Sequence, residues 1–130
     1  MPKIYTCIWS NDKAAEMAKF YKSIFKGTKI GKTSYWINNP MGIKEGSVLT
    51  MHITILGQKI MLLNGYAERS FNESISLVIP CKNQKEIDYY WKKLISGGGK
   101  EVQCGWAIDK YGVHWQVAHG WRVRRPATGL

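Results

Sequence analysis

The sequence predicts an α+β fold in which one unit of strands and helix occurs twice in tandem. Segments 70 residues apart share a pattern of strand, polar turn, helix and glycine stop, which indicates an internal repeat. Residues 14–25 and 87–95 each carry apolar side chains at helical spacing, and runs typical of strands surround both segments. The predicted order is therefore βαβββ followed by βαββ, with room for one further strand.

In the first half, residues 3–9 are predicted to form a strand, and "SND" a turn with candidate N-caps for the following helix. That helix is expected to end at Gly27. Gly57 lies between two strand-like runs and is expected to form a hairpin turn, and the turn-rich residues 37–45 form a loop of the kind that often borders binding sites. The strands expected after the helix are 29–36, 47–56 and 58–64.

In the second half, residues 76–79 align with 6–9 and are expected to form the matching strand. Asn83 with Glu86 three residues later resembles a capping box, and the glycine run 97–99 is expected to end the helix. "DKYG" at 109–112 predicts a second hairpin turn. The strands expected on either side of that region are 100–106 and 113–118.

The length of 130 residues favours a single domain, and a content of 45% apolar and 22% charged residues is globular. The chain has no basic segment followed by a long apolar run and no stretch of eighteen apolar residues, so we expect a cytoplasmic protein with no membrane span. Three widely spaced cysteines, Cys7, Cys81 and Cys104, are expected to be reduced thiols.

The net charge of +10 is the one unusual bulk property, since basic surfaces favour nucleic acids, anionic membranes or acidic small molecules. Its lysines are spread over both predicted helices, where they are more often solubilising than functional, so nucleic acid is not the expected partner. Residues 119–130 form a basic C-terminal segment that we expect to be flexible.

The motifs "FYKSIF", "SVLTMHITILGQKIMLLNG", "FNESIS" and "QCGWAIDKYGVHWQV" resemble the vicinal oxygen chelate superfamily, which includes glyoxalases, bleomycin-resistance proteins and dioxygenases. Within it they are similar to the group described as 3-demethylubiquinone 3-methyltransferase-like. The resemblance covers residues 1–118 and implies one domain of two βαβββ modules, about 1–66 and 70–118. It implies that their strands curl into a cup-shaped mixed sheet with helices on the outer face, and that the protein is a homodimer.

The resemblance also implies four strand positions that hold the metal ion in the metalloenzymes of the superfamily. They fall on Thr6, Thr50, Ser74 and Gln116, with an offset of one or two residues allowed on the first strand. Hydroxyl and amide groups are poor ligands for a transition metal, so no cofactor is predicted. A divalent metal stays open as an alternative, held by His52, His114 and Gln116.

Strand alternation indicates which other side chains share the faces of these residues. Thr50 is in phase with His52 and Thr54, Ser74 with Ser76, and Gln116 with His114. The opposite faces are expected to pack under the helices, and they carry Met51, Ile53 and Ile55 on one strand and Ile75, Leu77 and Ile79 on another.

Further candidates lie near the strand ends and the link between the modules. Trp106 and Asn64 are expected to contact a ligand, and Glu73 is the candidate general base if the protein is an enzyme. The residues expected to bind a ligand are Thr6, Thr50, His52, Asn64, Ser74, Trp106, His114 and Gln116.

Three functions follow from these observations. The first is binding of a small organic molecule in the cup between the modules, without the standard metal site. The second is a metal-dependent lyase, dioxygenase or thiol transferase that uses the histidine set. The third is a basic protein associated with nucleic acid through the C-terminal arginines. Methyl transfer is not expected, because the only glycine run ends a helix and does not lead from a strand into one.

Overall fold

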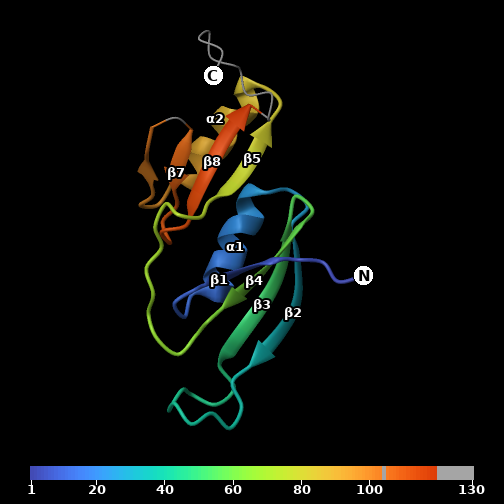
Figure 1. Ribbon diagram of the computed structural model, residues 1–130, viewed down its shortest axis with the longest axis vertical. Coiled ribbons are helices and arrows are strands. Elements are labelled where there is room, and N and C mark those ends of the chain that lie inside the picture. Colours follow the sequence, from blue (N-terminus) through green and yellow to red (C-terminus); the bar gives the residue numbers. More distant parts are fainter. Residues whose placement is uncertain (104, 120–130) are drawn as a thin grey trace. The chain divides into compact units, whose positions relative to one another are not determined.

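The computed structural model describes residues 1–103 and 105–119. The chain folds into two compact units, Met1–Arg69 and a second unit that begins at Ser70. Figure 1 shows the elements of both units along the chain. Cys104 and the C-terminal residues 120–130 lie outside the described residues. His119, the first residue of the expected flexible tail, is instead the last residue of a strand.

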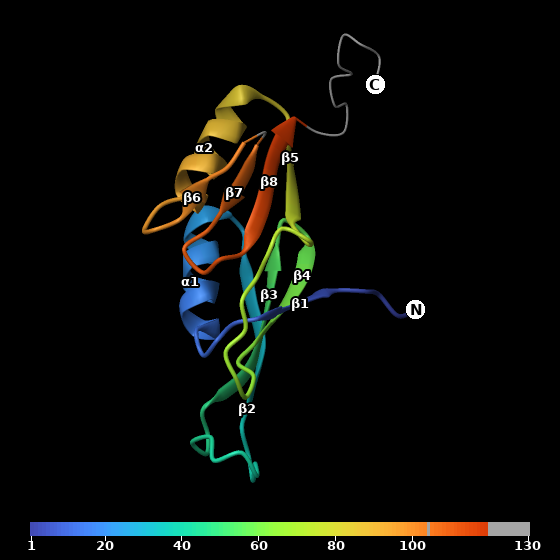
Figure 2. The same ribbon diagram turned by 60° about the vertical axis from the view of Figure 1, so that its left-hand side comes forward.

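The first unit is a four-stranded mixed sheet with one helix. Its elements are β1 (Thr6–Trp9), α1 (Ala14–Ile24), β2 (Lys29–Tyr35), β3 (Val48–Ile55) and β4 (Gln58–Leu63). The strand order is β1-β4-β3-β2, with β1 parallel to β4 and the other neighbours antiparallel. Figure 2 shows α1 against one face of this sheet, so its other face carries no helix of this unit.

The second unit repeats this topology. Its elements are β5 (Leu77–Cys81), α2 (Gln84–Leu94), β6 (Lys100–Glu101), β7 (Trp106–Ile108) and β8 (His114–His119). The order is β5-β8-β7-β6, with β5 parallel to β8. The predicted pair of βαβββ modules is therefore confirmed. The additional strand arises because the run 100–106, expected as one strand, forms two, and Gly105 between them takes a positive φ of 80°.

Helix α1 forms where the apolar stripe predicts it and buries Ala14, Met17, Ala18, Tyr21 and Ile24. Its stripe packs against the sheet residues that are buried on the same side: Ile8, Ile53, Ile55, Ile60 and Leu62. Each large apolar side chain buried in this way contributes roughly 1.5–3 kcal/mol, so this layer forms the core of the first unit.

The two helices begin differently. On α2, Asn83 Oδ1 accepts from the Glu86 backbone N–H at 2.9 Å, which confirms the predicted cap. The expectation that "SND" caps α1 is wrong, because the N-cap is Lys13, which makes no side-chain cap bond. The first amide of α1, Ala14 N–H, instead donates to Asn64 Oδ1 at 3.0 Å.

Both predicted hairpin turns are present. Leu56 and Gly57 have φ values of 47° and 83°, a pair of positive angles that matches a type I′ turn between β3 and β4. The turn from β7 to β8 is fixed by Asp109, whose buried carboxylate accepts from the Tyr111 and Val113 amides and from Trp115 Nε1 at 2.9–3.0 Å. These bonds set the start of β8.

The 70-residue offset holds for the helices but not for the strands. Helices 14–24 and 84–94 match exactly at this offset, whereas buried Ile8 falls on Val78, which is 44% exposed, and not on buried Ile79. A one-residue slip moves every side chain to the opposite face of a strand. Ile75, expected under the helix, is 77% exposed and precedes β5, so that expectation is wrong.

Neither helix has the length and apolar character needed to cross a bilayer, within the residues that the structure describes.

Candidate functional site

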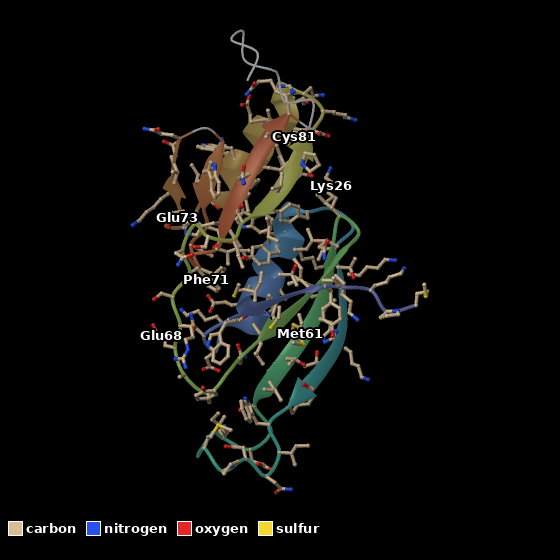
Figure 3. All side chains as sticks on the ribbon, viewed as in Figure 1. Lys26, Met61, Glu68, Phe71, Glu73 and Cys81 are labelled. Carbon is tan, nitrogen blue, oxygen red and sulfur yellow. The ribbon has the colours of Figure 1, made fainter. Side chains whose placement is uncertain are left out.

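The helix-free face of the first sheet carries two of the four predicted binding residues of the first unit, Thr50 and His52. Strand register arranges its side chains in rows across the strands, because residues paired in register point to the same side. One row joins Lys29, Thr54 and Lys59. The next joins His52, Met61 and Cys7, and the third joins Ser34, Thr50, Leu63 and Trp9. Met61, labelled in Figure 3, marks the middle of this face.

Thr50 and His52 both lie on this face and are half-buried. The Thr50 hydroxyl shares a hydrogen bond with the Ser34 hydroxyl at 2.5 Å, across two neighbouring strands. The His52 ring lies 5.8 Å from the Tyr5 ring, centroid to centroid. The hydroxyl pair and the aromatic–imidazole contact lie between the row of Lys29, Thr54 and Lys59 and the indole of Trp9, so this face combines polar and apolar groups.

Thr6 lies on the opposite side of the sheet. It pairs in register with Ile60, whose side chain is buried on the helix side. The residues of β1 on the side of Thr50 are Cys7 and Trp9, one position on either side of buried Ile8. The sequence allowed an offset of one or two residues on this strand. In the structure, the residue after Thr6, Cys7, lies on the side of Thr50.

An aromatic and cationic cluster lies at the Trp9 end of this face. The Arg69 guanidinium carbon lies 5.4 Å from the centroid of the Trp9 ring and 5.6 Å from that of Tyr66, and the two rings meet edge to face. Trp9 Nε1 donates to the Ala67 carbonyl at 2.6 Å. Gly65 is required beneath the ring, since a side chain there would overlap Trp9. The segment 65–69 is therefore folded onto the end of β1.

Asn64, a predicted ligand-binding residue, is buried and engaged in the fold. Its Oδ1 caps α1 at Ala14, and its Nδ2 donates to the Val48 carbonyl at 3.3 Å. Its own carbonyl accepts from Trp36 Nε1 at 3.2 Å. Asn64 therefore joins the helix, β3 and the start of the 37–45 loop.

In the second unit, the helix-free face brings together Gln116, Ser76, Trp106 and His114. Gln116 Nε2 donates to Ser76 Oγ at 2.9 Å, and Trp106 pairs in register with Gln116. His114 lies two residues from Gln116 on the same side of β8 and pairs in register with Ile108. All four residues are half-buried, so this face also combines an amide, a hydroxyl and an imidazole with an indole ring.

Ser74 and Glu73 precede β5 in an exposed turn (Figure 3). The Ser74 amide donates to Asn72 Oδ1 at 2.8 Å, an Asx turn that shapes this segment. The side chain that bonds to Gln116 is that of Ser76, two residues beyond Ser74 and in the same predicted phase.

Donor chemistry does not fit the standard metal site of the superfamily. The described residues, 1–103 and 105–119, contain no group of three or more His, Cys, Asp or Glu side chains placed to hold a metal ion. Thr50, Ser74 and Gln116 offer hydroxyls and one amide, which neutralise little of a divalent charge, and on β1 the side of Thr50 is occupied by Cys7 and Trp9 in place of Thr6. His52 and His114 belong to different units.

Two thiols differ in environment. Cys7 is exposed on the helix-free face, and partial burial raises the pKa of its thiol. Cys81 is buried at the end of β5, where burial and then the Glu86 carboxylate raise its pKa to about 11. Both thiols are protonated near neutral pH and are therefore weak nucleophiles.

Several residues of these faces carried no signal in the sequence. Ser34 and Lys29 lie on β2, whose irregular register with β3 includes shifts that alternation alone does not reveal. Arg69 lies in a segment without secondary structure, and its contact with Trp9 spans sixty positions of the chain. Ser76 could have been found, because it shares the predicted phase of Ser74.

The chain is similar to a described protein family and to several solved structures. The family model described as 3-demethylubiquinone-9 3-methyltransferase matches residues 2–118. A PhnB protein from Bacillus cereus, provisionally described as a 3-demethylubiquinone-9 3-methyltransferase, is 31% identical, with 89% of this chain and 98% of that chain covered and a TM-score of 0.72. No curated protein matches.

More distant structures share the fold. Protein PA1353 from Pseudomonas aeruginosa is 14% identical, with coverage of 92% and 99% of the two chains and a TM-score of 0.69. A mutant of the fosfomycin resistance protein FosX from Listeria monocytogenes, in complex with Mn(II) and a dihydroxypropylphosphonic acid, is 18% identical, with coverage of 92% and 91% and a TM-score of 0.57.

Proposed function

We propose a function from one premise, that this chain belongs to the family described as 3-demethylubiquinone-9 3-methyltransferase and has the vicinal oxygen chelate fold. The protein binds a small, partly apolar organic molecule on the helix-free faces of its sheets, and it does so without the standard metal site of the superfamily.

The observation that carries this proposal is the composition of the two helix-free faces. Each has a hydrogen-bonded polar pair, Ser34 with Thr50 and Ser76 with Gln116, set among half-buried apolar or aromatic side chains. Sites for small molecules combine mostly apolar walls with a few fixed polar groups. Aromatic neighbours, Trp9 on one face and Trp106 on the other, supply large contact areas at low entropic cost.

Methyl transfer is not part of the proposal, although it appears in the family description. Binding of a nucleotide-like methyl donor usually uses a glycine-rich turn from a strand into a helix. The turn from β1 to α1 is Ser10–Lys13 and that from β5 to α2 is Lys82–Asn83, and neither contains glycine.

A thermal-shift screen of neutral and charged organic compounds, followed by calorimetry on the hits, tests this function. We expect a hit to stabilise the protein by about 2.7 kcal/mol at a hundredfold excess over its dissociation constant. Trp106→Ala or Trp9→Ala should weaken such a hit, whereas Tyr89→Ala on α2 is a matched aromatic control that should leave it unchanged. A screen in which no compound binds would contradict the proposal.

Elemental analysis of untagged protein, purified without chelator, tests the part of the proposal that concerns metal. We expect no stoichiometric transition metal and no shift in melting temperature on titration with Mn²⁺, Zn²⁺ or Ni²⁺. A stoichiometric metal that is lost in His52→Ala or His114→Ala would instead favour a metal-dependent enzyme.

We also propose that the protein is a homodimer, as the family resemblance implies. Light scattering coupled to gel filtration measures the mass directly, and a monomeric mass over the micromolar range would remove this part of the proposal.

A further inference from the structure

We infer that the ligand of the first unit is an anion with an apolar body, and that its acid group binds at the row formed by Lys29, Thr54 and Lys59. This inference rests on the proposed function and names the chemical class of its ligand. The apolar body would lie along the same face over Met61 and Leu63, toward Trp9.

The row is defined by strand register. Lys29 on β2 and Lys59 on β4 both pair with Thr54 on β3, so the three side chains project to the same side. Adjacent strands lie about 4.8 Å apart, which puts the two lysine backbones roughly 10 Å apart with the threonine hydroxyl between them. Two lysine side chains of this length can both reach an anion placed above Thr54.

The charges of this row are not neutralised within the protein. Neither Lys29 nor Lys59 has a carboxylate within ion-pair distance in the described part of the chain, and both are exposed. Lys59 Nζ lies 4.5 Å from the centroid of the Tyr5 ring, a cation–π contact that positions the ammonium without cancelling its charge. A carboxylate or phosphonate would therefore gain two charge-assisted hydrogen bonds and one from the hydroxyl.

The wider field of the unit has the same sign. Residues 1–69 contain ten Lys and Arg against four Asp and Glu, a net charge of +6, and residues 70–130 contain nine against five, a net charge of +4. None of the residues in the three rows of the helix-free face is acidic. This field attracts anions to the helix-free face of the first unit.

The remainder of the face is suited to an apolar body. Met61, Cys7 and Leu63 occupy the rows beyond the lysines, and Trp9 lies at the far end. The Ser34 and Thr50 hydroxyls bond to each other, which satisfies part of their hydrogen-bonding capacity within the protein. Methionine and tryptophan side chains adapt well to small apolar groups.

A small anion fits this row better than a nucleic acid does. Single-stranded nucleic acids are held by a groove that follows several successive phosphates, whereas here two lysines flank a single hydroxyl and the neighbouring rows are largely uncharged. The test below includes nucleic acid as an outcome.

Calorimetry with matched pairs of compounds tests the inference on the full chain. The pairs are 2-naphthoate with 2-naphthamide, octanoate with octanamide, and phenylphosphonate with its neutral diethyl ester. We expect each anion to bind about tenfold more tightly than its neutral partner, since two exposed charge pairs each contribute modestly to the affinity. The preference should shrink as salt is raised from 20 to 300 mM.

Variants of the lysine row test where the acid group of the ligand binds. Lys29→Gln with Lys59→Gln should lower the affinity for the anions about tenfold and leave the neutral compounds unchanged, and Thr54→Val should lower it about threefold. Lys19→Gln with Lys26→Gln, exposed lysines on and just after α1, makes the same change in net charge and should alter binding less than twofold. Arg69→Gln removes a cation at the Trp9 end of the face and should change the affinity for the anions and for their neutral partners by the same factor, because Arg69 contacts Trp9 and lies outside the lysine row.

Four results would overturn the inference: equal affinity for anions and amides, equal losses in the two double-lysine variants, a larger loss with Arg69→Gln, or tighter binding of oligo(dT) that the anions do not displace. Binding of neutral compounds alone would overturn the inference but leave the proposed function in place. A chain that binds no compound of either kind would contradict both.

Discussion

At the scale of single residues, Cys81 illustrates how position in the fold sets chemistry. Its thiol is 3% exposed at the end of β5, and Glu86 on the following helix faces it with a negative charge. Both effects disfavour the thiolate, and they raise the pKa from 9.0 to about 11. Cys7 is exposed on the helix-free face of the first sheet, so it is more accessible to solvent than Cys81.

The raised pKa of the Cys81 thiol predicts that the folded protein loses stability at alkaline pH. Because its folded pKa lies above that of the unfolded chain, the linked stability is fully present below about pH 9 and is lost as the pH rises toward 11. The total linked contribution is about 2–3 kcal/mol. Urea unfolding from pH 7.5 to 10.5 should show the difference between wild type and Cys81→Ala shrinking with pH. A difference that stays constant over this range would contradict the assignment.

Asn64, which is expected to bind a ligand, also has a role in the fold. An asparagine after a strand and beside a loop is a reasonable candidate for ligand binding, yet its amide bonds to Ala14 on α1 and Val48 on β3. A helix cap supplied from fifty positions away leaves no local signal. The same is true of Arg69 above Trp9 and Tyr66.

At the scale of elements, periodicity predicted both helices well. Residues 14–24 and 84–94 are helical because their apolar side chains recur every three or four positions and face a sheet. Strands were harder to bound, since the run 100–106 is interrupted and β1 begins at Thr6, three residues later than expected. Short strands depend on partners distant in the chain, and their limits follow the hydrogen bonds that those partners offer.

The hairpin between β3 and β4 provides a test at this scale. Leu56 adopts a φ of 47° and is 56% exposed, a conformation that is costly for a leucine and easy for asparagine. Leu56→Asn creates the Asn-Gly pair preferred in type I′ turns and should stabilise the protein by about 0.5–1 kcal/mol.

The matched variant Gly57→Ala places a side chain at a φ of 83° and should destabilise the protein by about 1 kcal/mol. Urea midpoints of both variants give the comparison. A lower urea midpoint for Leu56→Asn would contradict this prediction, because it would mean that the exposed Leu56 side chain contributes to packing.

At the scale of the whole molecule, the net charge of +10 is unevenly shared. The first unit carries most of the excess, and the arginines of the C-terminal segment lie outside the described residues. Charge of this kind influences association with anions of every size. Experiments therefore have to distinguish this general attraction of anions from specific binding at one site.

Binding to DNA should be weak and sensitive to salt. We expect fluorescence anisotropy with a 20-nucleotide strand to show association at 20 mM salt that is lost by 200 mM, because only a few lysines contact phosphates at one time. Truncation after Ala118 removes three arginines and should weaken the low-salt binding further. Submicromolar affinity that persists at 200 mM would favour the nucleic-acid alternative.

The sequence by itself determined the repeated α+β architecture, the two helices, both hairpin turns and the family, because each is encoded by local periodicity, turn chemistry or contiguous motifs. Only the tertiary structure decided which residues share a face. It placed Thr6 and Thr50 on opposite faces of the first sheet, joined Gln116 to Ser76 by a hydrogen bond, and aligned Lys29 and Lys59 about Thr54. The physical reason is that strand register depends on pairing between distant segments, and a shift of one residue reverses the side of the sheet to which a side chain points.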